Sequence, residues 1–176
     1  TVLDGAALVR EPEDFAYQYL QSGFPGRIES LFTEMVWRNN SYKTAQKENA
    51  PLPEFEREYY VITGLSAILD SLDAEGQDKL RTLMEKARPE YGIRFLLCDS
   101  AKAMSAHSAD GWYKTHITGS DGVWVGDGIS EQYLMKPSKM SNSLYAEVPN
   151  HFGYLLRRGR PVLVKLIEGR REEGEQ

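Results

Sequence analysis

The sequence predicts an α/β domain with a mostly parallel sheet, and the strongest signal lies near its middle. Two apolar runs that favour β-structure, Tyr59–Ile62 and Ile93–Cys98, flank a segment in which Leu80, Leu83 and Met84 recur at helical spacing. A helical crossover of this length joins neighbouring parallel strands. The continuous apolar runs indicate strands that are buried on both faces. Function is therefore expected beyond the carboxyl ends of these strands.

The residues before this unit predict a strand end and two helices. Residues 1–4 are typical of the end of a strand, and residues 11–21 have a helical apolar pattern that follows Pro12, a favourable first-turn residue. Residues 27–47 predict the longest helix. Its apolar stripe, expected to face the sheet, consists of Ile28, Leu31, Phe32, Met35 and Val36.

The residues after the unit predict short strands between tight turns. Val123–Val125 and Gln132–Met135 are two such strands, and Gly153–Leu156 with Val162–Ile167 form a terminal hairpin. The domain is expected to cover residues 1–168, with a charged, disordered tail at 169–176.

Composition limits the function classes. The chain has 176 residues and a net charge of −5, which argues against an extended nucleic-acid surface. Its one cysteine, Cys98, is expected to be a buried thiol, and a lone cysteine fits a reducing compartment. No run approaches the ~20 apolar residues of a membrane span. Because the chain starts at Thr1, inside an expected strand, it is interpreted as a fragment of a longer protein.

Nucleotide-binding motifs are missing where the fold class would place them. The glycine-rich run 119–128 lacks the spacing and the lysine of a phosphate-binding loop. The Tyr59–Ile62 strand stands where a Walker B strand would end in an acidic pair, but Thr63 and Gly64 follow it. Neither residue can hold Mg²⁺ or polarise water, so no catalytic or cofactor-binding residue is assigned.

Other polar clusters give weaker signals. The histidines at 107, 116 and 151 have no metal-type spacing, so no metal site is expected. No Ser–His–Asp arrangement can be argued from the sequence, because such triads are geometric. The C-terminal basic residues are either solvent-exposed charges on a hairpin, or they bind an acidic partner or lipid headgroups. They are Arg157, Arg158, Arg160, Lys165, Arg170 and Arg171.

Large side chains are dense after residue 110. Most are expected in the core, and any left exposed would anchor a protein partner, since rigid rings lose little entropy on burial. The candidate partner-binding residues are Trp112, Trp124, Tyr133 and Met135.

Four segments carry a family resemblance. Residues 32–42, 121–136, 149–154 and 159–167 resemble the C-terminal part of the EssC/EccC family, the FtsK/SpoIIIE-type ATPases of bacterial type VII secretion. The resemblance implies the last of several tandem RecA/FtsK-like P-loop domains, with three layers. The P-loop strand would precede Thr1, and a central place in the sheet would be left empty, to be filled by another segment or another copy.

The resemblance also implies a function. The chain would be a degenerate ATPase-like module that recognises WXG100-type export proteins and regulates the motor, at the cytoplasmic face of the bacterial membrane. ATP and Mg²⁺ would belong to the parent protein, whose other domains, or further copies of the chain, would be its neighbours. The alternative is an active ATP-hydrolysing translocase domain, for protein or DNA, whose P-loop lies outside this chain. The acidic balance makes DNA the least expected cargo.

Overall fold

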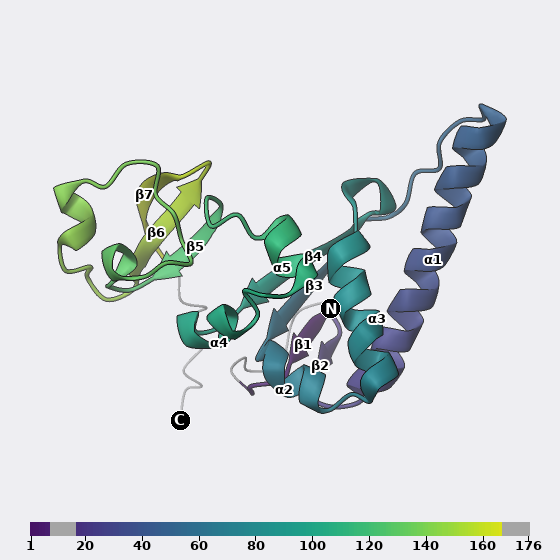
Figure 1. The fold of residues 1–176 in the computed structure, drawn as a ribbon, viewed down its shortest axis with the longest axis horizontal. Helices are drawn as coiled ribbons and strands as arrows, with labels where there is room; N and C mark the ends of the chain where they lie inside the picture. The colour runs from purple at the N-terminus through teal and green to yellow at the C-terminus, as the bar shows by residue number, and fades with distance from the viewer. Residues whose placement is uncertain (8–16, 167–176) are drawn as a thin grey trace, which may run out of the picture. The chain divides into compact units, whose positions relative to one another are not determined.

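Four parallel strands form the larger sheet of the computed structural model, which describes residues 1–7 and 17–166. The strands are β1 (Val2–Asp4), β2 (Tyr19–Leu20), β3 (Glu58–Thr63) and β4 (Ile93–Cys98). Their order is β2-β1-β3-β4, with Leu3 opposite Ile62 and Ile62 opposite Leu97 (Figure 1). Each strand is hydrogen-bonded to the next, so the expected empty central position is wrong for the described strands. The outer edges belong to β2 and β4.

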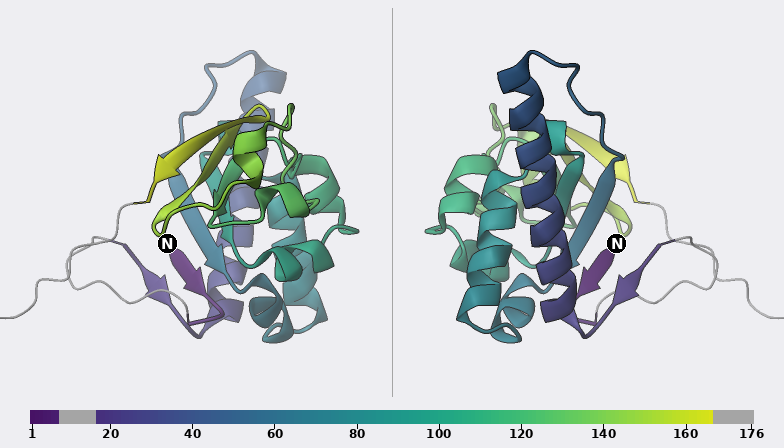
Figure 2. Two further views of the ribbon diagram at one scale, coloured as in Figure 1. Left: turned by 90° about the vertical axis from the view of Figure 1, so that its left-hand side faces the viewer. Right: turned by 90° about the vertical axis from the view of Figure 1, so that its right-hand side faces the viewer.

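The chain divides into two units, Thr1–Tyr113 and Lys114–Gln176. The helices of the first unit are α1 (Phe24–Glu48), α2 (Leu65–Asp70), α3 (Ala74–Lys86), the 3₁₀ turn η1 (Pro89–Tyr91) and α4 (Ala101–Ala106). α5 (Gly111–His116) spans the division. In both views of Figure 2, α1 and α3 run beside each other along the parallel sheet.

Among the described residues, one face of the parallel sheet is covered by helices and the other is covered only in part. The guanidinium of Arg27, on α1, lies 5.3 Å from the ring centre of Tyr60, which places α1 over the Tyr60 face. On the opposite face Tyr59, Leu96 and Cys98 are exposed. The expectation that these strands are buried on both faces is therefore wrong, and so is the expected burial of Cys98. Leu96 and Cys98 are exposed on β4, which is an edge strand, whereas Asp4 and Thr63 on the same face are buried.

Most of the predicted first-unit elements are present, with two corrections. The long helix is confirmed as α1, although Val36 is exposed. The crossover contains two helices, because Asp73 accepts a hydrogen bond from the N–H of Gly76 at 2.8 Å and starts α3 afresh. Of the helix predicted at 11–21, residues 11–16 lie outside the described residues, and Tyr19–Leu20 forms β2 instead.

The second unit contains a small antiparallel sheet. Its strands are β5 (Gly122–Val125), β6 (Phe152–Arg157) and β7 (Arg160–Lys165), and its 3₁₀ turns are η2 (Ile129–Glu131) and η3 (Asn142–Tyr145). The strands pair in the order β5-β6-β7, so the predicted hairpin is confirmed up to residue 165. The core of this sheet consists of Ile129, Leu144, Tyr154 and Leu156.

The strand predicted at Gln132–Met135 is wrong. The amide of Gln132 donates to the carbonyl oxygens of Ile129 and Met135 and accepts from the N–H of Met135 at 2.7 Å. This side chain satisfies the backbone groups that a neighbouring strand would otherwise pair with. The segment is therefore held as a loop.

The charged tail predicted at 169–176 lies outside the described residues.

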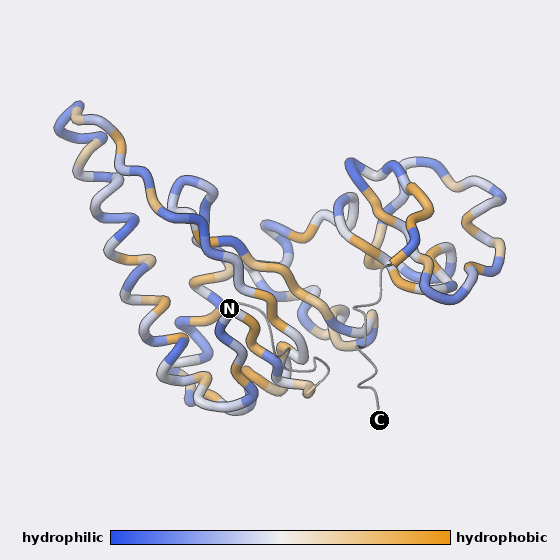
Figure 3. The backbone as a smooth tube through the Cα atoms, turned by 180° about the vertical axis from the view of Figure 1, so that it is seen from behind, coloured by the Kyte–Doolittle hydropathy of each residue, from blue (hydrophilic) through white to orange (hydrophobic). Residues whose placement is uncertain are grey.

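The α/β class, the parallel sheet and the C-terminal hairpin are confirmed, while the three-layer P-loop arrangement stays a prediction. Figure 3 shows hydrophobic residues along the parallel strands and a mainly hydrophilic far end of α1. Among the described residues, no helix is both long and apolar enough to cross a membrane.

Candidate functional site

The carboxyl edge of the parallel sheet is where the fold class places a ligand site. β1 ends there at Asp4, β3 ends at Thr63, and Cys98 and Asp99 follow from β4. Asp4 and Thr63 lie opposite each other in register. An acidic side chain therefore stands next to the position where the sequence indicated none, contributed by the neighbouring strand.

The Asp4 carboxylate is buried and surrounded by hydroxyl groups. The hydroxyl of Thr63 donates to its Oδ1, and the hydroxyl of Tyr19 donates to its Oδ2 at 2.8 Å. Both oxygens accept hydrogen bonds, which stabilises a buried carboxylate. Thr63 thus serves to hold Asp4, and its hydroxyl is already committed.

Gly64 cannot be replaced by an acidic residue without moving the backbone. Its φ of 62° and ψ of 49° lie in the left-handed region, and a Cβ there would stand 2.6 Å from the N atom of Ala6. The residue turns the chain from β3 into α2. A water-polarising carboxylate has no room at position 64.

Cys98 is not poised as a nucleophile at this edge. Desolvation by neighbouring atoms and, second, the negative charge of Asp99 raise the pKa of its thiol. A raised pKa leaves less thiolate near neutral pH, and the thiolate is the reactive form.

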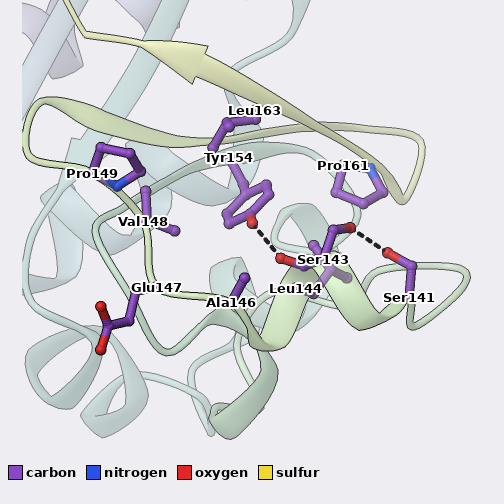
Figure 4. Close-up of a pocket in the computed structure, with 10 residues that line it drawn as sticks. All are labelled: Ser141, Ser143, Leu144, Ala146, Glu147, Val148, Pro149, Tyr154, Pro161 and Leu163. Carbon is purple, nitrogen blue, oxygen red and sulfur yellow. Dashed lines mark hydrogen bonds between the residues drawn. The ribbon is translucent and has the colours of Figure 1, made fainter.

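A pocket of about 280 Å³ opens in the second unit, beside β6, β7 and η3 (Figure 4). Its lining residues are Ser141, Ser143, Leu144, Ala146, Glu147, Val148, Pro149, Tyr154, Pro161 and Leu163. Tyr154 forms the inner wall, and its hydroxyl donates to the carbonyl oxygen of Ser143 at 2.8 Å. This bond ties the loop before β6 to the sheet and fixes the shape of the pocket.

The pocket combines apolar walls with a few polar groups. Leu144, Val148 and Leu163 supply carbon surface, and the hydroxyls of Ser141 and Ser143 lie 2.7 Å apart at one side. A cavity of this composition suits one apolar side chain together with the peptide groups that flank it. Tyr154, Pro161 and Leu163 lie on the hairpin that the sequence predicted, whereas the other wall residues come from the loop 141–149, for which the sequence pattern gave no signal.

The structure separates the predicted partner-binding residues. Trp112 belongs to the first unit and is 2% exposed. Trp124 and Met135 pack against the core of the second unit, and the indole N–H of Trp124 donates to the carbonyl of Asp127 at 2.7 Å. Tyr133 is 93% exposed in the same unit. None of the four lines the pocket, although three share its unit.

Comparison of the fold identifies two similar solved structures. The cytoplasmic domain of EssC superposes with a TM-score of 0.70 and 18% sequence identity, over 94% of this chain and 32% of that one. EssC ATPases 2 and 3 from Geobacillus thermodenitrificans give 0.64 and 16%, over 94% of this chain and 30% of that one. The chain thus spans about a third of the length of these proteins. No protein-family model matches it, and no curated protein matches it.

The likeness extends over nearly all of the chain, including both the parallel sheet and the small antiparallel sheet. At this level of identity it establishes the fold. The resemblance predicted from the sequence segments is confirmed at that level: the chain has the fold of an EssC ATPase-like domain.

Proposed function

We propose that the chain is a recognition module of a type VII secretion motor, and that it binds WXG100-type export proteins without hydrolysing ATP. The observation that carries the proposal is the likeness of fold to EssC over 94% of the chain. On this proposal the module works at the cytoplasmic face of the bacterial membrane, next to the ATP-binding domains of the same motor.

The carboxyl edge of the sheet supports the non-catalytic half of the proposal. Phosphoryl transfer needs a carboxylate to hold Mg²⁺ and a group to orient the attacking water. The carboxylate of Asp4 is buried and already accepts two hydroxyl hydrogen bonds, and Gly64 has no space for a side chain. We therefore interpret this edge as degenerate and assign it no turnover.

The pocket of the second unit supports the recognition half. We place the C-terminal segment of the export protein there, with an apolar side chain against Leu163 and Tyr154. Peptide groups on either side can bond the hydroxyls of Ser141 and Ser143. The exposed ring of Tyr133 offers further contact area in the same unit.

The test is peptide binding by two matched variants. Leu163 lines the pocket and is 49% exposed, whereas Val162, its neighbour on the opposite face of β7, is 55% exposed. Leu163→Glu should weaken binding of a C-terminal WXG100 peptide by about tenfold or more, because a carboxylate would enter an apolar wall. Val162→Glu should bind as the unaltered chain does. The assay is fluorescence anisotropy with a labelled peptide.

The alternative function gives different results. Peptide affinity that falls equally in both variants, or an unaltered chain that does not bind, would contradict docking in this pocket. Binding of Mg-ATP with measurable turnover would favour the active translocase domain.

A further inference from the structure

Three polar side chains of the first unit form a hydrogen-bonded series that the recognition function does not use. Ser66 lies in the first turn of α2, His107 follows α4, and Asp110 directly precedes α5. The Oγ of Ser66 is 3.1 Å from the Nε2 of His107, and the Nδ1 of His107 is 3.1 Å from the Oδ2 of Asp110. This is the nucleophile, base and orienting acid of a Ser–His–Asp triad.

The hydrogen bonds decide which nitrogen is the base. An ionised carboxylate only accepts, so the Nδ1 of His107 carries the proton that it shares with Asp110. The Nε2 is then left with its lone pair toward the hydroxyl of Ser66. The imidazole is held from a second side as well: the indole N–H of Trp112 donates to the same Oδ2 of Asp110 at 3.1 Å, and the two rings are 5.8 Å apart.

Ser66 differs from other serines of the same unit in the hydrogen-bond partner of its hydroxyl group. The hydroxyls of Ser71 and Ser105 donate to backbone carbonyl oxygens, those of Ile68 at 2.7 Å and Lys102 at 2.9 Å. A backbone carbonyl oxygen is too weak a base to remove the proton of a serine hydroxyl during a reaction. Ser66 is exposed, whereas the side chain of His107 is only 12% exposed, so the nucleophile faces solvent and its base is sheltered.

We propose that Ser66 is an activated nucleophile that accepts the acyl group of small activated esters. Its oxygen bonds to the ester carbonyl carbon while the hydroxyl proton passes to the Nε2 of His107. The carbon–oxygen bond to the leaving group then breaks, and the departing oxygen takes that proton. The products are a seryl ester and an alcohol. Water, deprotonated by His107 in the same way, hydrolyses the seryl ester to a carboxylic acid and restores the serine.

Asp110 acts through His107 as a positioning residue, because its carboxylate stabilises the imidazolium that forms during the transfer. The exposed position of Ser66 admits small donors without movement of the chain. The inference is independent of export-protein recognition, since it uses other residues in the other unit.

The test treats the purified chain with p-nitrophenyl acetate and maps the acetyl group by peptide mass spectrometry. Ser66 should carry it, and Ser66→Ala should abolish that label, while the control Ser105→Ala should leave the rate unchanged. His107→Ala should slow acetylation of Ser66 by about 10²-fold or more, and added imidazole should restore much of that labelling, because a diffusible base can occupy the vacated position. Nitrophenol release is read above a protein-free imidazole blank, since imidazole itself cleaves p-nitrophenyl acetate. A merely structural role of His107 would not be rescued in this way.

Two results would overturn the proposal. One is an acetyl label that is absent from Ser66 or that persists unchanged in His107→Ala. The other is a loss of rate in His107→Ala that imidazole does not restore while circular dichroism shows an intact fold. Asp110→Asn should give an intermediate rate, and a rate equal to that of the unaltered chain would remove Asp110 from the arrangement.

Discussion

The carboxylate of Asp4 depends on the hydroxyl groups around it. Thr63 donates to one oxygen and Tyr19 to the other, and both Asp4 and Thr63 are buried. An ionised group in such a place is stable only while its acceptors are satisfied. The threonine at the end of β3 is thus required by its neighbour in β1.

An acidic residue introduced at position 63 should therefore destabilise the fold. Thr63→Asp would place two carboxylates side by side in the interior, which should lower the free energy of unfolding by about 3 kcal/mol at neutral pH. Thr63→Ser keeps the hydroxyl and should cost no more than about 1 kcal/mol. Urea denaturation followed by circular dichroism measures both. Equal midpoints for Thr63→Asp and the unaltered chain would contradict the assigned role.

At the residue scale, the sequence predicted chemistry only where the residues are neighbours in the chain. Thr63 and Gly64 were recognisable because they directly follow the apolar run of β3. The serine–histidine pair of Ser66 and His107 is separated by 41 positions, and only the folded chain brings the two together. The pairing of Asp4 with Thr63 likewise needs the register of β1 and β3.

At the scale of elements, Arg38 joins three segments. This buried side chain of α1 forms ion pairs with Glu34 and Glu58, and it donates to the carbonyl oxygens of Glu56 at 3.0 Å and Tyr91 at 2.7 Å. The end of η1, the start of β3 and the middle of α1 are fixed to one another by this guanidinium.

Loss of the Arg38 side chain should lower the free energy of unfolding substantially. Arg38→Met leaves two carbonyl oxygens without this donor and removes the guanidinium from two carboxylates, so we expect a loss of about 3 kcal/mol in unfolding free energy. Arg81→Met is the control, because Arg81 makes a 3.6 Å ion pair with Asp78 and a 3.4 Å hydrogen bond to Gln77 within α3. Its loss should change the unfolding free energy by less than ~0.5 kcal/mol. Chemical denaturation compares the two, and similar losses would contradict the role of Arg38.

The β6–β7 turn should show a pH dependence. The N–H of Arg158, donating at 2.9 Å, and next the hydroxyl of Ser120 hold the pKa of Asp121 below its ordinary value of 3.8. A group with a lowered pKa stabilises the fold above its ordinary pKa, and this contribution is lost as the pH falls through the lowered value. Asp121→Asn should therefore unfold at a lower temperature than the unaltered chain at neutral pH.

That difference should shrink as the pH drops below 3.8, because protonation removes the same charge from the unaltered chain. Thermal unfolding of both proteins across the acidic range measures it. A difference that stays constant down to the most acidic pH would show that the charge of Asp121 is not its cause.

The sequence predicted elements well where one pattern repeats over many residues. The apolar stripe of α1 and the two apolar runs that flank the β6–β7 turn are of this kind, and these elements are present. It failed where one side chain decides the outcome, as with the cap at Asp73 and the amide of Gln132. It also could not tell that β4 is an edge strand, because an apolar run does not show how many neighbours a strand has.

At the scale of the whole molecule, the parallel sheet and the small antiparallel sheet carry different parts of the proposed function. The parallel sheet has, at its carboxyl edge, the buried carboxylate of Asp4 and a turn at Gly64 that has no space for a side chain. The second has the pocket beside Tyr154 and Leu163. The account therefore predicts that the chain binds a peptide and does not bind ATP.

The most direct test of this account is calorimetric titration of the chain with two ligands in turn. One is Mg-ATP, and the other is a C-terminal peptide of a WXG100 protein from the same genome. The account predicts peptide binding with a dissociation constant on the order of micromolar and no heat of binding for Mg-ATP. Binding of Mg-ATP without binding of the peptide would contradict it.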